Sequence, residues 1–453
     1  MTERSGALGR HAAGILLHPT SLPGGRIGKA AFAFVDFLKR AGCGAWQVLP
    51  LGPTGHARSP YSLVSAFAGA AGLLPDAMLR KKGPAPAELA DFIERERGWL
   101  HDYALFSILK TDRSDIPWWQ WPPEIRDRHP ASIDALMSRR ADDVSNVFRR
   151  QYRFAEAWGE LRRYANERGI LLYGDLPMFP VADSTDVWVN RPLFKLGPDG
   201  CARVTAGVPP DLFAADGQSW GNPVFDWDAM RDDGFRWWRE RVRHEFLRFD
   251  LLRWDHFRGL IATWEIPQSA RTAREGEWRD VPGRELLTAM RRDLGELPLV
   301  AENLGIITPE VEQLRHDFGL PGMHVFQFAF DGTKDNPHLP ENHEEQGVAY
   351  TGTHDNDTTL GWFQSLGTDV RAAVLEETGG DAGDMPWPAI RSVLQSRARL
   401  AVVPMQDYLS LDSTHRMNRP GIAEGNWRWQ LGKDDLTDRL AARIGEAVAA
   451  MAR

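Results

Sequence analysis

The chain has 453 residues, of which 43% are hydrophobic and 26% are charged, and its formal net charge at pH 7 is −8. This composition is typical of a soluble globular protein, and no apolar run approaches the ~20 residues that a membrane span needs. Nucleic-acid binding depends on clustered basic charge, so the acidic balance argues against a nucleic-acid partner as well as a membrane.

The N-terminal segment and the cysteines favour a cytoplasmic protein. Only a short apolar stretch precedes Pro19, which is a poor secretory signal and fits a first strand better. The two cysteines, Cys43 and Cys201, could form at most one bridge, and they do not form a metal-type cluster. We expect both thiols to be reduced and the protein to be cytoplasmic, as a monomer or weak homo-oligomer.

Short apolar runs bounded by turn residues recur along the chain and predict strands. They lack strict alternation of apolar and polar residues, as expected of strands buried on both faces, and helical stripes separate several of them. Eight parallel strands with intervening helices specify an α/β fold, a (β/α)₈ TIM barrel, as one domain spanning residues 1–453. The predicted strands are 14–19, 46–51, 171–176, 251–255, 297–302, 324–330, 348–352 and 400–407.

The helices and insertions are predicted from apolar stripes and from spacing. A stripe through Phe34 and Leu38 predicts a helix that ends at Gly42. About 120 residues separate the second and third strands, and about 75 separate the third and fourth, which is far more than ordinary loops need. We therefore expect helical and loop insertions after strands two and three, as inserted subdomains at about 84–168 and 177–248.

Acidic residues follow four of the predicted strands at their C-terminal ends. They are Asp175, Asp255, Glu302 and Asp355. Chemistry in a barrel of this kind is concentrated at that end of the strands. One such acid could be a helix N-cap or an ion-pair partner, but four on the same face of a barrel favour a shared site.

The surroundings of two of these acids favour different roles. Arg253 precedes Asp255 by two residues, so both side chains leave the same face of the strand, and the guanidinium would keep the carboxylate ionised, as suits a nucleophile. Glu302 follows the apolar run that begins at Leu297, which would raise its pKa toward the range of a general acid.

Metal and nucleotide sites are less well supported by the sequence. His354 beside Asp355 could be a metal pair, but there is no HxH or HExxH motif and no second nearby histidine at ligand spacing. No GxGxxG or GxxxxGK(S/T) motif stands between a strand and a helix. We therefore expect no cofactor and no metal, and paired acids in such a barrel point to glycoside chemistry.

Many short motifs occur in a characteristic order from end to end. They include WQVLPLGPTG at 46–55, SPY at 59–61, GDLPMF at 174–179, GQSWGNP at 217–223, RWDHFRG at 253–259, AENLG at 301–305 and YTGTHDNDT at 350–358, followed by RMNRPG and EGNWRW. Through these motifs the chain closely resembles the amylomaltase or disproportionating-enzyme family, the 4-alpha-glucanotransferases of glycoside hydrolase family 77.

The resemblance implies an enzyme that transfers a segment of an α-1,4-glucan to a new 4-hydroxyl of glucose or of another α-1,4-glucan or maltooligosaccharide. It implies that Asp255 is the nucleophile of a retaining double displacement through a covalent glycosyl-enzyme, that Glu302 is the acid/base and that Asp355 stabilises the transition state. The implied substrate contacts are Ser59, Tyr61, Asp175, Gln218, Trp220, Arg253, His354 and Asn418, with Phe328 close by.

Three details of the site region remain alternatives. Tyr61 could stack beneath the sugar or be a packed core tyrosine. Gln218 and Trp220 lie in a Gly- and Pro-rich stretch that could be a lid, because transfer beats hydrolysis only if the glycosyl-enzyme is shielded from water, or an ordinary surface loop. His56 and Arg58 stand where family members often carry an aromatic residue and an acid, which puts a secondary glucan site near His56 in doubt.

Two other functions fit parts of this pattern. An amylase-type hydrolase or α-glucosidase would use the same acids with poorer exclusion of water. A glucan-binding barrel without activity is the second alternative, although the intact set of three acids at Asp255, Glu302 and Asp355 argues against it.

Overall fold

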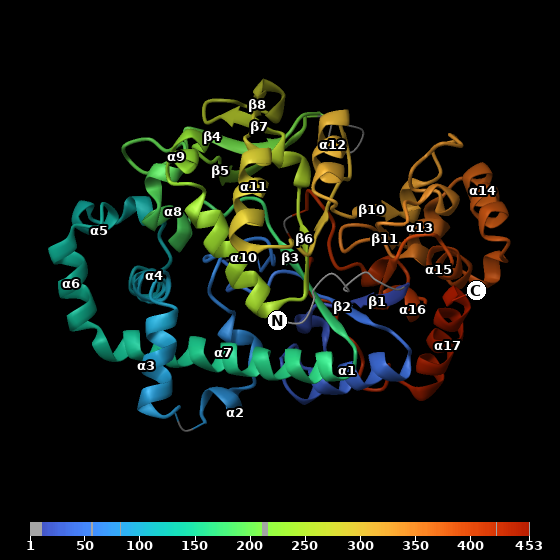
Figure 1. Cartoon of the computed structure of the whole chain (residues 1–453), viewed down its shortest axis with the longest axis horizontal. Helices are drawn as coiled ribbons and strands as arrows, with labels where there is room; N and C mark the ends of the chain where they lie inside the picture. Colours follow the sequence, from blue (N-terminus) through green and yellow to red (C-terminus); the bar gives the residue numbers. More distant parts are fainter. Residues whose placement is uncertain (1–10, 56–57, 82, 211–215, 423, 453) are drawn as a thin grey trace.

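The structure, a computed structural model, describes residues 11–55, 58–81, 83–210, 216–422 and 424–452, so His56 lies outside the described residues. An eight-stranded parallel sheet lies at its centre, in the order β10-β11-β12-β1-β2-β3-β6-β9 (Figure 1). The edge strands meet where the Ala301 N–H donates to the Pro321 carbonyl oxygen at 2.8 Å, so the sheet forms a nearly closed barrel. The strands are β1 (Ala12–Leu16), β2 (Ala45–Gln47), β3 (Leu171–Leu176), β6 (Leu251–Trp254), β9 (Leu299–Ala301), β10 (Gly322–Val325), β11 (Gly347–Tyr350) and β12 (Leu400–Pro404).

Each of these strands overlaps one of the eight predicted strands, and the predicted TIM barrel is confirmed. Alternate residues of a strand enter two different cores. In β12, Leu400 and Val402 pack in the barrel interior, whereas Ala401 and Val403 join the larger outer core that includes Phe34 of α1. Because both faces are buried, the strands are apolar throughout rather than alternating in polarity.

Helices cover the outside of the barrel (Figure 1). In α1 (Lys29–Arg40), Phe34 and Leu38 are buried as predicted, and the chain leaves the helix through Gly42, whose φ of 69° favours glycine. Within the described ranges, no helix combines the length and the apolar character that a membrane span requires. The other barrel-side helices are α7 (Ala141–Glu167), α10 (Arg236–Arg248), α11 (Gly283–Leu294), α12 (Pro309–Asp317), α13 (Thr359–Ser365), α14 (Thr368–Thr378), α15 (Trp387–Leu394), α16 (Met405–Tyr408) and α17 (Asp438–Ala449).

The long segment between β2 and β3 is helical, as predicted, and has a small core of its own. Phe92, Leu100 and Phe148 belong to that core. Residues 117–121 of this region, which include three tryptophans, pack on the chain after β3. The Trp118 backbone N–H donates to Asp183 at 3.2 Å. The helices before α7 are α2 (Asp76–Leu79), α3 (Pro86–Arg95), α4 (Leu100–Asp112), α5 (Pro123–Arg126) and α6 (Pro130–Arg139), and those that follow β3 are α8 (Thr185–Val189) and α9 (Trp227–Asp232).

A second sheet of four antiparallel strands, in the order β5-β4-β7-β8, was not predicted. Its strands β4 (Val204–Val208) and β5 (Gln218–Pro223) follow β3, but β7 (Ala262–Pro267) and β8 (Glu277–Asp280) follow β6. The insertions expected after strands two and three are therefore present, and a third insertion, which was not predicted, follows strand four. The outer strands β5 and β8 are largely exposed and consist mainly of polar residues, Gly, Pro and Trp, so they lack the apolar run of a barrel strand.

Candidate active site

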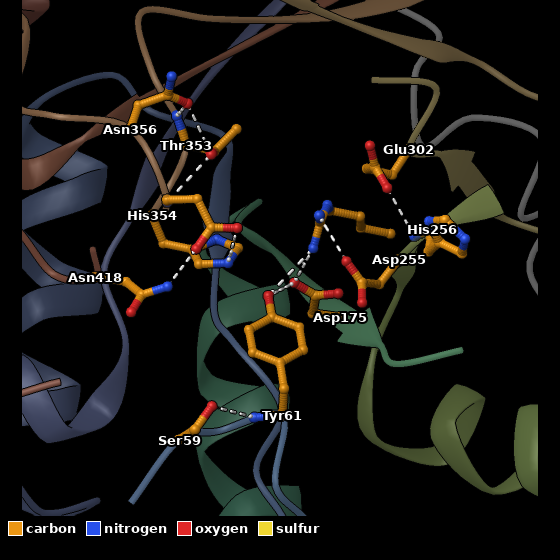
Figure 2. A network of polar contacts seen from close by, with 12 residues as sticks. Ser59, Tyr61, Asp175, Asp255, His256, Glu302, Thr353, His354, Asn356 and Asn418 are labelled. Atoms are coloured by element: carbon orange, nitrogen blue, oxygen red, sulfur yellow. Dashed lines mark hydrogen bonds and ion pairs between the residues drawn. The ribbon is translucent and has the colours of Figure 1, made fainter. Parts of the chain in front are cut away.

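The four acids predicted from strand ends lie together at the C-terminal end of the barrel. The parallel register pairs Asp175 of β3 with Arg253 of β6, and Arg253 in turn with Val300 of β9, two residues before Glu302. Figure 2 shows Asp255 and Glu302 on one side of this group, with Asp175 between them and the loop that follows β11. The barrel geometry therefore brings together side chains that are far apart in the sequence.

A buried pair, Arg253 and Asp175, forms the base of the site. Arg253 Nη1 donates to Asp175 Oδ2 at 2.7 Å, and the side chains are 6% and 0% exposed. The Tyr61 hydroxyl donates to the same carboxylate oxygen at 2.7 Å. Asp175 was predicted as a substrate contact, but in this structure its carboxylate holds Arg253 and Tyr61 in place. Burial raises the pKa of Asp175, and the charge of Arg253 partly offsets that rise.

Asp255 is bound by Arg253 and is partly exposed in the site. Arg253 Nη2 donates to Asp255 Oδ1 at 2.9 Å, as expected from their positions on one face of the strand, and the Asp255 side chain is 27% exposed. Burial raises the pKa of Asp255 to about 6 although the charge of Arg253 lowers it. Arg253 was expected to keep this carboxylate ionised; its charge acts in that direction, but desolvation is the larger effect on the Asp255 pKa.

Glu302 is held by two backbone N–H groups. The His256 N–H donates to Oε2 at 2.7 Å and the Leu304 N–H donates to Oε1 at 2.9 Å. Burial, with a smaller contribution from the charge of Asp255, raises the pKa of Glu302 to about 8, although the charge of Arg253 lowers it. The pKa of Asp255 is thus lower than that of Glu302, which is the direction that a nucleophile and a general acid require.

Asp355 faces this pair from the loop after β11. Its carboxylate accepts a hydrogen bond from Asn418 Nδ2 at 2.6 Å and lies 3.4 Å from His354 Nε2. The Asp355 side chain is 46% exposed, so it remains accessible to a ligand. Burial lowers the pKa of His354, which is therefore a neutral hydrogen-bonding group at pH 7.

Aromatic rings form one wall of the site. Tyr61 stacks on His354, with ring centroids 5.2 Å apart and an interplanar angle of 20°, and the Ser59 hydroxyl oxygen accepts a hydrogen bond from the Tyr61 N–H at 3.3 Å. The ring centroid of Trp427 lies 6.2 Å from that of Tyr61 and 5.9 Å from that of His354. Trp427 was not among the predicted site residues, and its only sequence signal was its place in the EGNWRW motif.

The predicted lid residues lie on the β4–β5 hairpin rather than on an irregular loop. Trp220 is 37% exposed, its Nε1 lies 3.4 Å from Gln218 Oε1, and its ring contacts His256 edge to face at 4.9 Å. The backbone of His256, which has a φ of 53°, also binds Glu302. His256 thus links the hairpin to the acid/base candidate, a role that the sequence did not indicate. Phe328 packs instead beside the barrel interior and His338.

A cavity of about 730 Å³ adjoins this aromatic wall. Its lining includes Arg58 and Pro60 on the loop that carries Tyr61, Trp427 on the C-terminal side, and Tyr103 of α4. A cavity of this size can accommodate a ligand of several sugar units.

A possible metal-ligand group lies elsewhere among the described residues. Ligand atoms of Glu312, His316 and Glu344 lie within 4.8 Å of one another. Arg315 Nη2 donates to Glu312 at 2.5 Å and to Glu344 at 2.8 Å. The guanidinium therefore already supplies the positive charge that these carboxylates need.

Comparison with known proteins supports one family throughout. A family model described as 4-alpha-glucanotransferase matches residues 17–78 and 72–435. A 4-alpha-glucanotransferase of Thermus thermophilus is 42% identical, covering 96% of this chain and 97% of its own. One of Synechocystis sp. is 41% identical over the same shares of the two chains.

Solved structures give the same result. The amylomaltase of Streptococcus agalactiae in complex with acarbose has a TM-score of 0.93 at 33% identity, covering 98% of this chain and all of its own, 100%. The amylomaltase of Corynebacterium glutamicum has a TM-score of 0.77 at 15% identity, covering 100% of this chain and 77% of its own, which supports the fold alone.

Proposed function

Because this chain belongs to the 4-alpha-glucanotransferase family, we propose that its site moves a segment of an α-1,4-glucan to a new 4-hydroxyl by a retaining double displacement. Family membership supports the enzyme class. The mechanism is supported by one arrangement: Asp255 and Glu302 lie on the same side of one site (Figure 2), and the pKa of Asp255, about 6, is lower than that of Glu302, about 8. The substrates would be α-1,4-glucans and maltooligosaccharides.

In the first step the Asp255 carboxylate attacks the anomeric carbon. The bond from that carbon to the departing glycosidic oxygen breaks, and Glu302 gives its proton to this oxygen. A covalent glycosyl-enzyme and a free glucan chain result. Arg253, which holds Asp255 Oδ1, aims the nucleophile.

In the second step the 4-hydroxyl of an acceptor sugar enters. Glu302 removes its proton, the hydroxyl oxygen attacks the anomeric carbon, and Asp255 leaves as a carboxylate. Two displacements at one carbon keep its configuration. Asp355, oriented by Asn418, would bind sugar hydroxyls and favour the distorted ring, while the Tyr61 ring would form a platform beneath the sugar.

Incubation with maltotriose alone tests this function against hydrolysis. Transfer yields glucose together with longer maltooligosaccharides, whereas hydrolysis yields only products shorter than the substrate. Product sizes followed over time by chromatography distinguish the two, and exclusively shorter products would favour the hydrolase alternative.

We expect a bell-shaped dependence of kcat/KM on pH, with a maximum near 7. Asp255 must be ionised, so activity rises as the pH increases through about 6, and Glu302 must be protonated, so activity falls as the pH passes about 8. The two limbs belong to the interacting pair. Initial rates of glucose release from maltotriose over this range provide the measurement. Full activity well above the upper limb would contradict the role given to Glu302.

Replacing Trp220 with alanine should shift the products toward hydrolysis. The ring covers His256 beside Glu302, and its loss would let water compete with the acceptor at the glycosyl-enzyme. We expect the ratio of hydrolysis to transfer to rise by about five- to tenfold, equivalent to roughly 1 kcal/mol. Trp278→Ala is the matched control, because Trp278 belongs to the same sheet but packs on Trp264. An equal change in both variants would rule out a specific shielding role.

A further inference from the structure

A small cavity is lined by Asp175 but not by Tyr61 or Arg253. Its polar lining comes from Asp175 and from Arg241, Glu245 and Arg248 of α10, and apolar residues of the 50–68 segment complete it. The volume open to the centre of a water molecule is about 10 Å³. That is enough for one water molecule.

Two side chains that line this cavity carry polar atoms that lack a partner among the described residues. Asp175 Oδ1 is buried and unpaired, although Oδ2 is fully engaged. Arg241 is 2% exposed, and its Nε and Nη1 are buried and unpaired as well. Leaving such groups without a hydrogen bond costs about 1–3 kcal/mol each, and more when the group is charged. An acceptor and a donor beside one polar cavity are the partners that a bridging water requires.

Arg241 is fixed in place and remains charged. Its guanidinium lies 5.1 Å from the Trp237 ring centroid and 5.0 Å from that of Trp238. Burial lowers the pKa of Arg241 to about 10, and the charges of nearby carboxylates partly offset this effect, so it stays protonated at neutral pH.

We propose that one buried water occupies this cavity and joins Asp175 Oδ1 to Arg241, which makes Arg241 a positioning residue for the catalytic group. Arg241 does not touch the substrate. Through the water it stabilises the ionised form of Asp175 at Oδ1. Asp175 in turn binds Arg253 and Tyr61 through Oδ2. The effect on catalysis rests on the proposed function, whereas the water site does not.

The charges around these groups determine the expected pH effect. Removing a buried cation disfavours ionised carboxylates nearby, so the pKa values that set the acid limb of activity rise. Arg241 is surrounded by the charged groups of Asp186, Glu245 and Asp255 and, across the cavity, by those of Asp175 and Arg248. The charged and titratable groups near Asp175 and Asp255 are those of Tyr61, Arg253, Glu302, His354 and Asp355.

Arg241→Met tests this role. We expect the acid limb of the kcat/KM profile for maltotriose to move upward by about one pH unit, a tenfold change in proton affinity. Arg241→Lys, which keeps a cation, should retain a limb close to the original one. Arg315→Met is the control, because Arg315 is equally buried, 2% exposed, but binds Glu312 and Glu344 instead. An unmoved limb in Arg241→Met, or an equal shift in all three variants, overturns the proposal.

A crystal structure of the unaltered protein tests the water directly, even if Arg241→Met fails to fold. Density for a water within hydrogen-bond distance of Asp175 Oδ1 and Arg241 supports the proposal, and a dry cavity or a direct contact between the two side chains overturns it. Failure of the proposed function would appear differently, as the absence of longer products from maltotriose while the water remains in place.

Discussion

Asp255→Asn is expected to lower kcat for transfer from maltotriose by about 10⁴-fold or more, the scale seen when a nucleophile is removed. The asparagine side chain has nearly the same shape, and its oxygen can still accept the hydrogen bond from Arg253. An amide cannot form the glycosyl ester at the anomeric carbon, however, so the first displacement is lost. The measurement is the rate of formation of glucose and of longer maltooligosaccharides.

Asp228→Asn is the matched control for this variant. Asp228 lies on α9 with its side chain 92% exposed, and its partner is Arg231 on the same helix. The control should keep both the melting temperature and kcat of the unaltered enzyme. Retention of more than about a tenth of kcat by Asp255→Asn would remove Asp255 from the role of nucleophile. The loss would then be smaller than even the roughly 10²–10⁴-fold that general acid–base catalysis contributes.

The barrel could be predicted from sequence because its strands are buried on both faces. Continuous apolar runs such as the one ending at Asp255 are a strong signal, and each ends where the parallel register places the site. The second sheet has no such signal. Residues such as Trp220 in β5 and Trp278 in β8 belong to short, half-exposed strands, whose pairing depends on contacts distant in the sequence.

Within the site, residue identity was easier to predict than electrostatics. The pairing of Arg253 with Asp255 follows from their two-residue spacing in a strand. The direction of the Asp255 pKa does not, because it depends on how deeply the folded chain buries the group. For the same reason the sequence did not indicate that Asp175 would be occupied by Tyr61, or that a backbone N–H of His256 would hold Glu302.

Glu302→Gln should separate the two displacements. Glutamine cannot protonate the departing oxygen, so kcat with maltotriose should fall by about 10³-fold. An α-maltosyl fluoride donor has a leaving group that needs little protonation, and it should still react with Asp255. The second step then lacks a base, so the glycosyl-enzyme should accumulate and become detectable by mass spectrometry as a covalent maltosyl adduct.

Azide provides the decisive comparison, because this anion attacks the anomeric carbon without needing a general base. Azide should restore turnover of the fluoride donor by Glu302→Gln and yield an α-maltosyl azide. The first displacement gives a β-linked glycosyl-enzyme, and attack by azide inverts the anomeric carbon a second time. It should not restore turnover by Asp255→Asn, and it should not affect Glu285→Gln, an exposed glutamate on α11. The Glu302→Gln variant should also lose the fall in activity above about pH 8. A β-configured product, or rescue of both site variants alike, would contradict a double displacement in which Asp255 carries the sugar and Glu302 moves the proton.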